Sequence, residues 1–145
     1  MYHLSVQICP DRLTNRSLLG QYCFVGATNL FIRQRMPGGN DLIKWSKTNA
    51  SWYAREKRKW GTLVALYARE QGFKVITAPA HFEFELWEPN RKRDPDGMAF
   101  GACVLILDAL QDAKLLENDS WNWVKSLAFT WKQAAPIGVK LTVNT

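Results

Sequence analysis

The chain has 145 residues, 47% of them apolar, and this length and composition predict one packed domain with a substantial core. The formal net charge of +6 indicates an anionic partner without naming it. The three cysteines lack C-x-x-C spacing and the two histidines are far apart, so neither a disulfide framework nor a structural zinc site is expected. No segment approaches the roughly 18 apolar residues of a membrane span, and residues 1–19 lack a signal-peptide pattern. We therefore expect a cytoplasmic protein with no membrane partner.

The first part of the chain, residues 1–29, is the least informative. Leu4, Val6 and Ile8 alternate with polar residues, as in a short strand. No pattern of chemically active side chains occurs there. We therefore divide the chain into an N-terminal extension over residues 1–29, whose role is unknown, and a domain over residues 30–145.

The domain is expected to open with a short strand and a turn. Residues 30–35 are apolar enough for the strand, and Pro37-Gly38-Gly39-Asn40 is a strong turn signal. Either Asn40 or Asp41 is suited to cap the helix that follows. We expect that helix to be interrupted at residues 46–51.

A clearer helix is expected over residues 52–71, and one of its faces carries a run of cations that includes Arg55 and Arg58. Two interpretations stay open. The run is either a solvated helix face or a phosphate-contacting face. Trp45, Trp52 and Tyr53 near it either stack against bases or belong to the core.

The rest of the domain alternates strand and helix patterns. Together they predict an α+β fold, a small mixed sheet of three to five strands with two main helices packed on it. The final two strands are expected to pair antiparallel with each other. The expected strands are residues 74–78, 82–87, 123–131 and 137–143, and the expected helix is residues 98–116.

Charge is concentrated where the strand at residues 82–87 crosses to the following helix. Pro95 favours an extended backbone at Asp94 and suits the first position of a helix, so Asp94 and Asp96 can point towards one spot. Two such carboxylates repel each other, and a divalent cation such as Mg²⁺ removes that conflict. The tetrapeptide Asp94-Pro95-Asp96-Gly97 also fits a plain type I turn, and that alternative stays open. The residues placed to hold a polyanion beside this turn are Asn90, Arg91, Lys92 and Arg93.

Two further aspartates follow. Asp119 lies in a polar turn after the helix, from which a third carboxylate is expected to return to Asp94 and Asp96. Asp108 lies on the helix itself and either faces solvent or points at the acidic residues.

Three blocks in order resemble a known family. The blocks are Asn90-Arg91-Lys92-Arg93-Asp94-Pro95-Asp96, a helix containing Leu107-Asp108-Ala109-Leu110, and Asn118-Asp119-Ser120 before a strand. Over roughly residues 30–143 the chain resembles the RusA family of phage-borne Holliday-junction resolvases.

The resemblance implies a homodimeric, RusA-like endodeoxyribonuclease that resolves four-way DNA junctions by symmetric nicks, using Mg²⁺ or alternatively Mn²⁺. It places Asp94, Asp96 and Asp119 at the positions of the family's catalytic, metal-binding acids. No Walker-type phosphate loop occurs, so no nucleotide cofactor is expected. The residues expected to contact DNA are Asn90, Arg91, Lys92, Arg93, Arg55, Arg58 and Lys125.

The chain also departs from the family. Gly97 stands where the family usually has Asn, and residues 100–103 offer no cation where the family usually has a lysine. Losing one such contact to the transition state typically costs several kcal/mol of barrier, about 2.7–4 kcal/mol. The alternative function is therefore a branched-DNA-binding protein of the same fold with weak or no nuclease activity.

Overall fold

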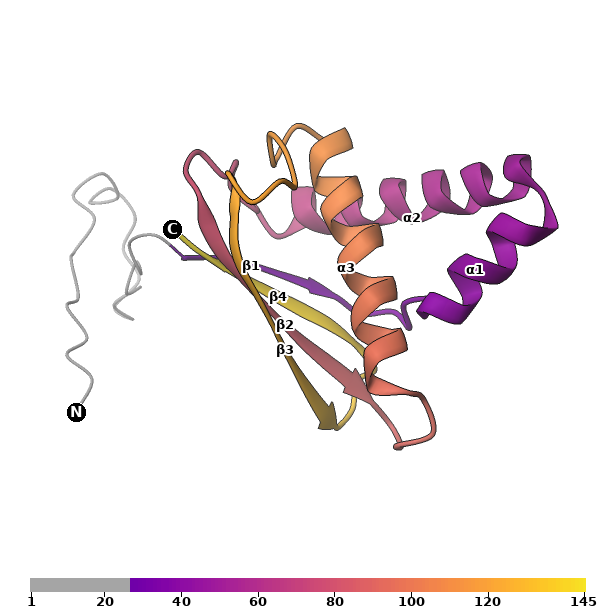
Figure 1. The fold of residues 1–145 in the computed structure, drawn as a ribbon. Helices are drawn as coiled ribbons and strands as arrows, with labels where there is room; N and C mark the ends of the chain where they lie inside the picture. Colours follow the sequence, from indigo (N-terminus) through magenta and orange to yellow (C-terminus); the bar gives the residue numbers. More distant parts are fainter. Residues whose placement is uncertain (1–26) are drawn as a thin grey trace.

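The computed structural model describes residues 27–145, and within that range the chain forms an α+β domain with a four-stranded mixed sheet and three helices (Figure 1). The predicted fold class is confirmed. The strand expected near residues 4–8 lies outside the described residues, and β1 spans the expected boundary between residues 29 and 30. The elements are β1 (Ala27–Ile32), α1 (Gly39–Thr48), α2 (Ala50–Glu70), β2 (Ala80–Glu88), α3 (Pro95–Asp112), β3 (Val124–Gln133) and β4 (Gly138–Asn144).

The sheet has the strand order β1-β4-β2-β3. β4 runs antiparallel to both β1 and β2, whereas β2 and β3 are parallel. The prediction that the last two strands pair with each other is therefore wrong. The short connection after β3 passes the end of β2, where the Ala134 N–H donates to the Glu88 carbonyl oxygen at 3.1 Å. An alternating pattern specifies which face of a strand is buried, but it does not specify the neighbouring strand.

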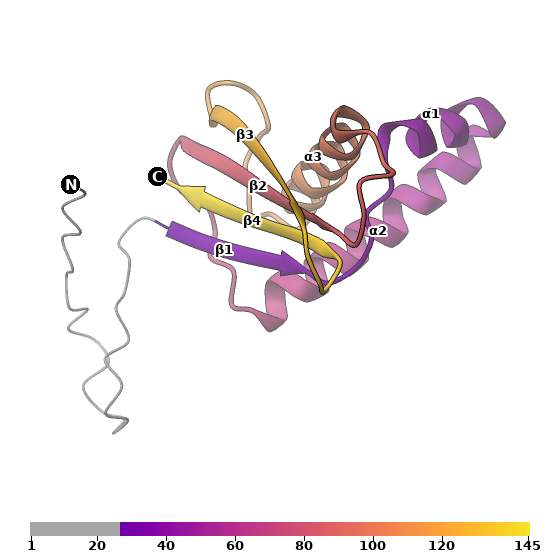
Figure 2. The ribbon, with the colours of Figure 1, turned by 90° about the horizontal axis from the view of Figure 1, so that it is seen from below.

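All three helices of the described chain lie on one face of the sheet, and the other face carries no helix (Figure 2). β2 is the central source of the core, because its side chains alternate between buried and exposed positions along the strand. The core forms between the inward side chains of the sheet and the buried sides of α2 and α3. Its largest fully buried members include Phe82, Phe84, Leu30, Ile32, Leu105, Ile106, Leu110 and Leu141.

The helices largely follow the predicted pattern. The expected interruption is confirmed at Asn49, whose side-chain oxygen accepts the Ser51 N–H at 2.7 Å and starts α2. α1 begins earlier than predicted, and Asp41 acts from inside its first turn by accepting the Gly38 N–H at 2.9 Å.

The strand expected at residues 74–78 does not form. The Ile76 N–H donates instead to the Leu115 carbonyl oxygen at 2.8 Å, in the loop that follows α3. This segment is therefore bonded to a loop rather than to the sheet, and its apolar side chain at Ile76 is buried by that packing.

A close backbone crossing places the start of α1 against α3. A Cβ atom at Gly101 of α3 would collide with the Pro37 carbonyl oxygen and would lie 2.9 Å from the backbone of Gly38. Glycine is therefore required at this crossing, because no side chain fits between the two backbones. The crossing holds the first turns of α1 and α3 side by side.

Candidate functional site

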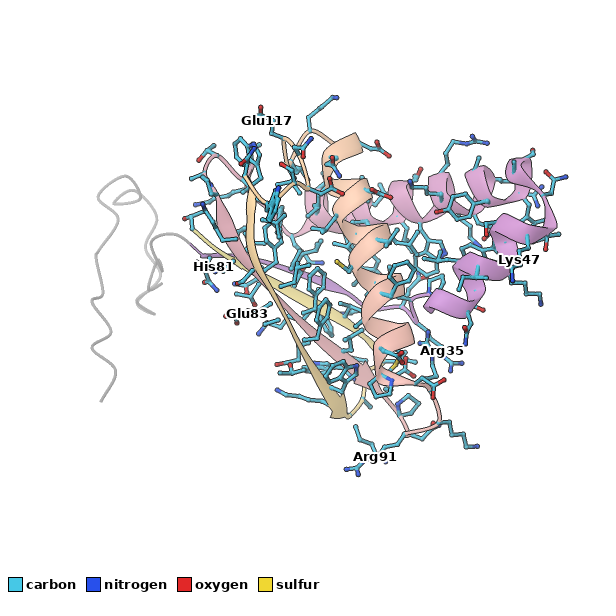
Figure 3. The ribbon with its side chains drawn as sticks, in the orientation of Figure 1. Arg35, Lys47, His81, Glu83, Arg91 and Glu117 are labelled. Atoms are coloured by element: carbon cyan, nitrogen blue, oxygen red, sulfur yellow. The ribbon has the colours of Figure 1, made fainter. Side chains whose placement is uncertain are left out.

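An open pocket of about 620 Å³ lies where α1 and α3 begin. Its wall is formed by residues 35–41 and Trp45 on one side and by Lys92, Arg93, Asp94, Gly97 and Met98 on the other. Figure 3 places Arg35 and Arg91 at this end of α3 and Glu117 at the opposite end. The pocket therefore joins the charged crossing after β2 to a segment more than fifty residues earlier in the sequence.

Asp94 and Asp96 flank Pro95 at the start of α3. The expected backbone geometry is confirmed, since Asp94 is extended with φ −68° and ψ 129° and Pro95 occupies the first turn of the helix. That the two carboxylates point towards one spot stays a prediction. Asp94 occupies the N-cap position, yet its side chain makes no capping hydrogen bond. Both side chains are exposed, and within residues 27–145 neither carboxylate forms an ion pair or hydrogen bond. The two carboxylates thus perform no anchoring task in the fold.

The four residues before Asp94 divide into two kinds. Arg91 and Lys92 are exposed, and the Asn90 side chain only accepts the Lys92 N–H at 3.0 Å to close a local turn. Arg93 is engaged, because its guanidinium donates to a Glu88 carboxylate oxygen at 2.5 Å and to the Met36 carbonyl oxygen at 2.8 Å. Arg93 therefore fastens the pocket wall, while Lys92 and Arg35 are exposed cations there.

Glu88 is a site residue that was not predicted. It is the last inward-pointing residue of β2, with its side chain 12% exposed, and it pairs with Arg93 and at 3.8 Å with Arg35. The signal for it was available in the sequence. Phe82, Phe84 and Leu86 point inward at every second position, and the next residue in that series is Glu88. A carboxylate at an inward position needs a cation as its partner.

Asp119 does not join Asp94 and Asp96 within one chain. It follows α3, whose 18 residues correspond to a length of about 27 Å. Burial raises the pKa of the Cys103 thiol to about 11, and the negative charge of Asp119 adds to that rise. Asp119 therefore lies within electrostatic reach of Cys103, in the middle of α3. Lys125, the second residue of β3, lies at the same distant end. Among residues 27–145 no three His, Cys, Asp or Glu side chains come close enough to hold a metal ion.

The basic run on α2 also lies away from the pocket, next to the end of α1 rather than its start. Arg58 is exposed, and the Arg55 guanidinium stacks 4.6 Å from the centre of the Trp52 ring. Lys57 bonds to Asp108 at 2.7 Å, and this hydrogen bond raises the pKa of Lys57. Asp108 therefore joins α3 to α2 and points neither at solvent nor at the other aspartates.

The donor set at the pocket suits a hard cation that also contacts a phosphate. Mg²⁺ is commonly bound through one or two carboxylates, with water and substrate phosphates completing its coordination. Asp94 offers one such carboxylate in the pocket, which Lys92 also lines, and the exposed Asp96 offers a second at the adjoining first turn of α3. The residues present therefore fit a Mg²⁺ ion that is shared with a phosphate-bearing ligand.

No protein-family model and no curated protein sequence matches the chain. Within residues 27–145, no helix has both the length and the apolar composition needed to cross a membrane.

Proposed function

We propose that the protein is a Mg²⁺-dependent endodeoxyribonuclease that resolves four-way DNA junctions by paired nicks. The observation that carries the proposal is the pair of exposed carboxylates at Asp94 and Asp96, for which the described residues offer no hydrogen-bond or ion-pair partner. Asp94 lines the open pocket together with Lys92 and Arg35, and Asp96 follows it in the first turn of α3. Metal-dependent phosphodiester hydrolysis uses carboxylates that bind the metal ion, next to cations that contact the phosphate.

Each part of the pocket has a distinct task in this proposal. Asp94 and Asp96 hold the ion, and a bound Mg²⁺ supplies activation of water and stabilisation of the leaving oxygen. Lys92 and Arg35 position the DNA backbone, which gives affinity rather than sequence reading. The first turns of α1 and α3 add the positive ends of two helix dipoles to the same region.

The proposed enzyme acts as a homodimer. A four-way junction has arms related by symmetry, and a two-fold dimer presents two equivalent sites to two opposite strands. Symmetric nicking in this proposal therefore depends on two protomers bound to one junction.

The test is cleavage of a synthetic four-way junction labelled on each strand in turn. With Mg²⁺ we expect two symmetric nicks, and we expect Asp96→Asn to lose cleavage by at least about 100-fold, since even outer-shell partners of a metal contribute about 10–100-fold. Binding of the junction should stay equal or tighten, because the substitution removes negative charge beside phosphate.

The matched control is Asp112→Asn, which removes the same charge from an exposed aspartate at the far end of α3. It should cleave like the unaltered chain. Normal cleavage by Asp96→Asn, or equal loss in both variants, would contradict the assignment of the acidic pair.

A second candidate is a junction-binding protein that does not cut. It is favoured by the position of Asp119, and by Phe100, which is 54% exposed where a lysine would assist catalysis. Binding without nicking in both Mg²⁺ and Mn²⁺ would establish it. In either case Lys92→Ala should lower the salt slope of binding by about one unit for each lost phosphate contact, while Lys47→Ala, at the end of α1, should not.

A further inference from the structure

The face of the sheet that carries no helix within residues 27–145 gathers aromatic and cationic side chains from all four strands (Figure 2). The buried residues of β2 alternate with Glu85 and Trp87, which therefore point to this open face. Directly paired residues of neighbouring strands share a face. By that rule Phe31, Lys140 and Lys132 lie on the open face as well.

Phe31 and Trp87 form the aromatic centre of the open face. Their ring centroids are 5.3 Å apart, and the ring planes meet at 62°. The two rings reach each other across β4 because the residue paired with Trp87 is Gly138, which has no side chain. Both rings are half-buried, so each keeps part of its surface open to solvent.

Arginine and lysine side chains surround the two rings. The Arg33 guanidinium lies 5.7 Å from the centre of the Phe31 ring, and the Lys132 ammonium lies 5.9 Å from the centre of the Trp87 ring. Lys140 is the residue of β4 paired with Phe31. Arg33 is exposed and the Lys132 side chain is 54% exposed, so both can turn from a ring to a phosphate. We call these residues, Phe31, Arg33, Trp87, Lys132 and Lys140, the aromatic–basic patch.

The carboxylate beside the patch is already engaged. Glu85 accepts a hydrogen bond from Lys132 at 2.9 Å and from the Trp87 indole N–H at 2.6 Å. The hydrogen bond from Lys132 lowers the pKa of Glu85, and the charge of Lys140 contributes to the same shift. Glu83, the preceding residue of β2 on this face, is four positions before Trp87, or about 13 Å along the strand. Positive charge therefore exceeds negative charge around the two rings, and the patch is complementary to an anion.

The aromatic–basic patch lies at the same end of the sheet as the pocket. Trp87 is followed by Glu88, whose side chain points to the helix-bearing side and pairs with Arg35 at 3.8 Å. Figure 3 places Arg35 and Arg91 at this end of the molecule and Glu83 towards the other end. The patch and the pocket are thus two sides of the end of β2, and one flexible strand can contact both.

We propose that the aromatic–basic patch binds unpaired nucleotides of single-stranded DNA. Bases stack on Phe31 and Trp87, while Arg33, Lys132 and Lys140 contact the phosphates, a combination that suits any base because every base has a π-face. A paired duplex is excluded as the occupant because its bases are stacked on one another and do not offer their faces to a sheet. The choice of DNA rests on the proposed function, whereas the stacking and the charge do not.

Binding is tested with the full chain and a fluorescein-labelled oligothymidylate of about 12 nucleotides, within the usual size of single-strand sites. The measurement is fluorescence anisotropy in EDTA, so that no metal-dependent cleavage contributes. We expect saturable binding. Absence of binding would overturn the proposal, and tighter binding of an oligouridylate of the same length would overturn the assignment to DNA. Because junction cleavage is measured separately with Mg²⁺, either proposal can fail while the other stands.

Stacking is tested by changing Phe31 without removing its bulk. Phe31→Leu keeps an apolar side chain but loses the ring, and it should weaken oligothymidylate binding by about 5–150-fold, the usual effect of losing one stacked base. Phe31→Tyr should bind like the unaltered chain, with circular dichroism as a check on folding. The control is Trp121→Ala, since Trp121 is 88% exposed and lies before the start of β3, at the other end of the sheet. Normal binding by Phe31→Leu, or equal loss in Trp121→Ala, would overturn the stacking.

The phosphate contacts and the preference for unpaired bases have tests of their own. Lys140→Gln should reduce the salt slope of oligothymidylate binding by about 0.7 for one lost phosphate contact, whereas Lys114→Gln, just after α3, should not change it. Phe31→Leu should leave the affinity for a blunt duplex unchanged. An unaltered slope in Lys140→Gln would overturn the phosphate contact, and equal loss of duplex and single-strand binding in Phe31→Leu would overturn the choice of unpaired bases.

Discussion

At the scale of single residues, Gly101 fixes how α1 and α3 meet. A methyl group there would overlap the Pro37 carbonyl oxygen and the Gly38 backbone, and neither can move as a flexible side chain would. We expect Gly101→Ala to lower the free energy of unfolding by about 1–3 kcal/mol, the usual cost of overpacking. Urea unfolding followed by circular dichroism measures this change.

Gly61 provides the matched control, because it lies within α2 and a Cβ there would meet nothing within 4 Å. Alanine is favoured over glycine in a helix by about 1 kcal/mol, so Gly61→Ala should raise the free energy of unfolding. The two glycines should thus respond with opposite signs. A stabilising Gly101→Ala would show that the α1–α3 crossing is looser than described.

At the scale of elements, two of the three glutamates of β2 have different surroundings. Glu88 points inward to Arg93 and has a side chain 12% exposed, whereas Glu85 pairs with Lys132 at 2.9 Å on the open face of the sheet. Glu88→Gln should lower the free energy of unfolding by about 1.5–3 kcal/mol, because a hydrogen bond between charged groups is weakened away from water. Glu85 also accepts the Trp87 indole N–H at 2.6 Å, and its side chain is 24% exposed against 54% for Lys132. Glu85→Gln should still cost less, about 1 kcal/mol, because water screens the half-exposed pair with Lys132.

Thermal or urea unfolding of the two variants side by side measures this contrast. Equal costs would mean that Glu88 is as well solvated as Glu85, and that Arg93 is available to bind DNA after all.

The local sequence patterns predicted where helices and strands form better than they predicted which strands lie next to each other. β2 was predictable because Phe82, Phe84 and Leu86 alternate, and α2 because its buried residues recur at helical spacing. The pairing of β4 with β1 and β2 was not predictable, since alternation says nothing about the adjacent strand. The segment at residues 74–78 has strand-like composition, yet its backbone bonds to the loop after α3.

At the scale of the whole molecule, the site was predictable where its residues are consecutive. Asp94 and Asp96 flank one proline, so their local geometry follows from the sequence. Arg35 and Glu88 reach the pocket only through the fold, which no short-range pattern contains. The position of Asp119 was not predictable in this way: its charge acts on Cys103 in the middle of α3, and within residues 27–145 it forms no metal-binding group with Asp94 and Asp96.

The proposed dimer makes a prediction about how the acids are shared between subunits. If each site combines Asp96 of one chain with Asp119 of the other, Asp96→Asn and Asp119→Asn should be inactive alone and complement each other when subunits exchange. A heterodimer then has one site with both changes and one with neither. Random exchange at equal amounts makes about half of the dimers heterodimers, so about a quarter of the sites regain activity.

The regained activity should appear as single nicks rather than paired ones, because each heterodimer has one intact site. Mixing Asp96→Asn with Asp94→Asn is the control, since both residues belong to the same side of the site and both sites of that heterodimer stay damaged. Were Asp119 to act within its own chain, the first mixture would also carry a lesion in every site. Activity from neither mixture would therefore exclude a site shared across the two-fold axis.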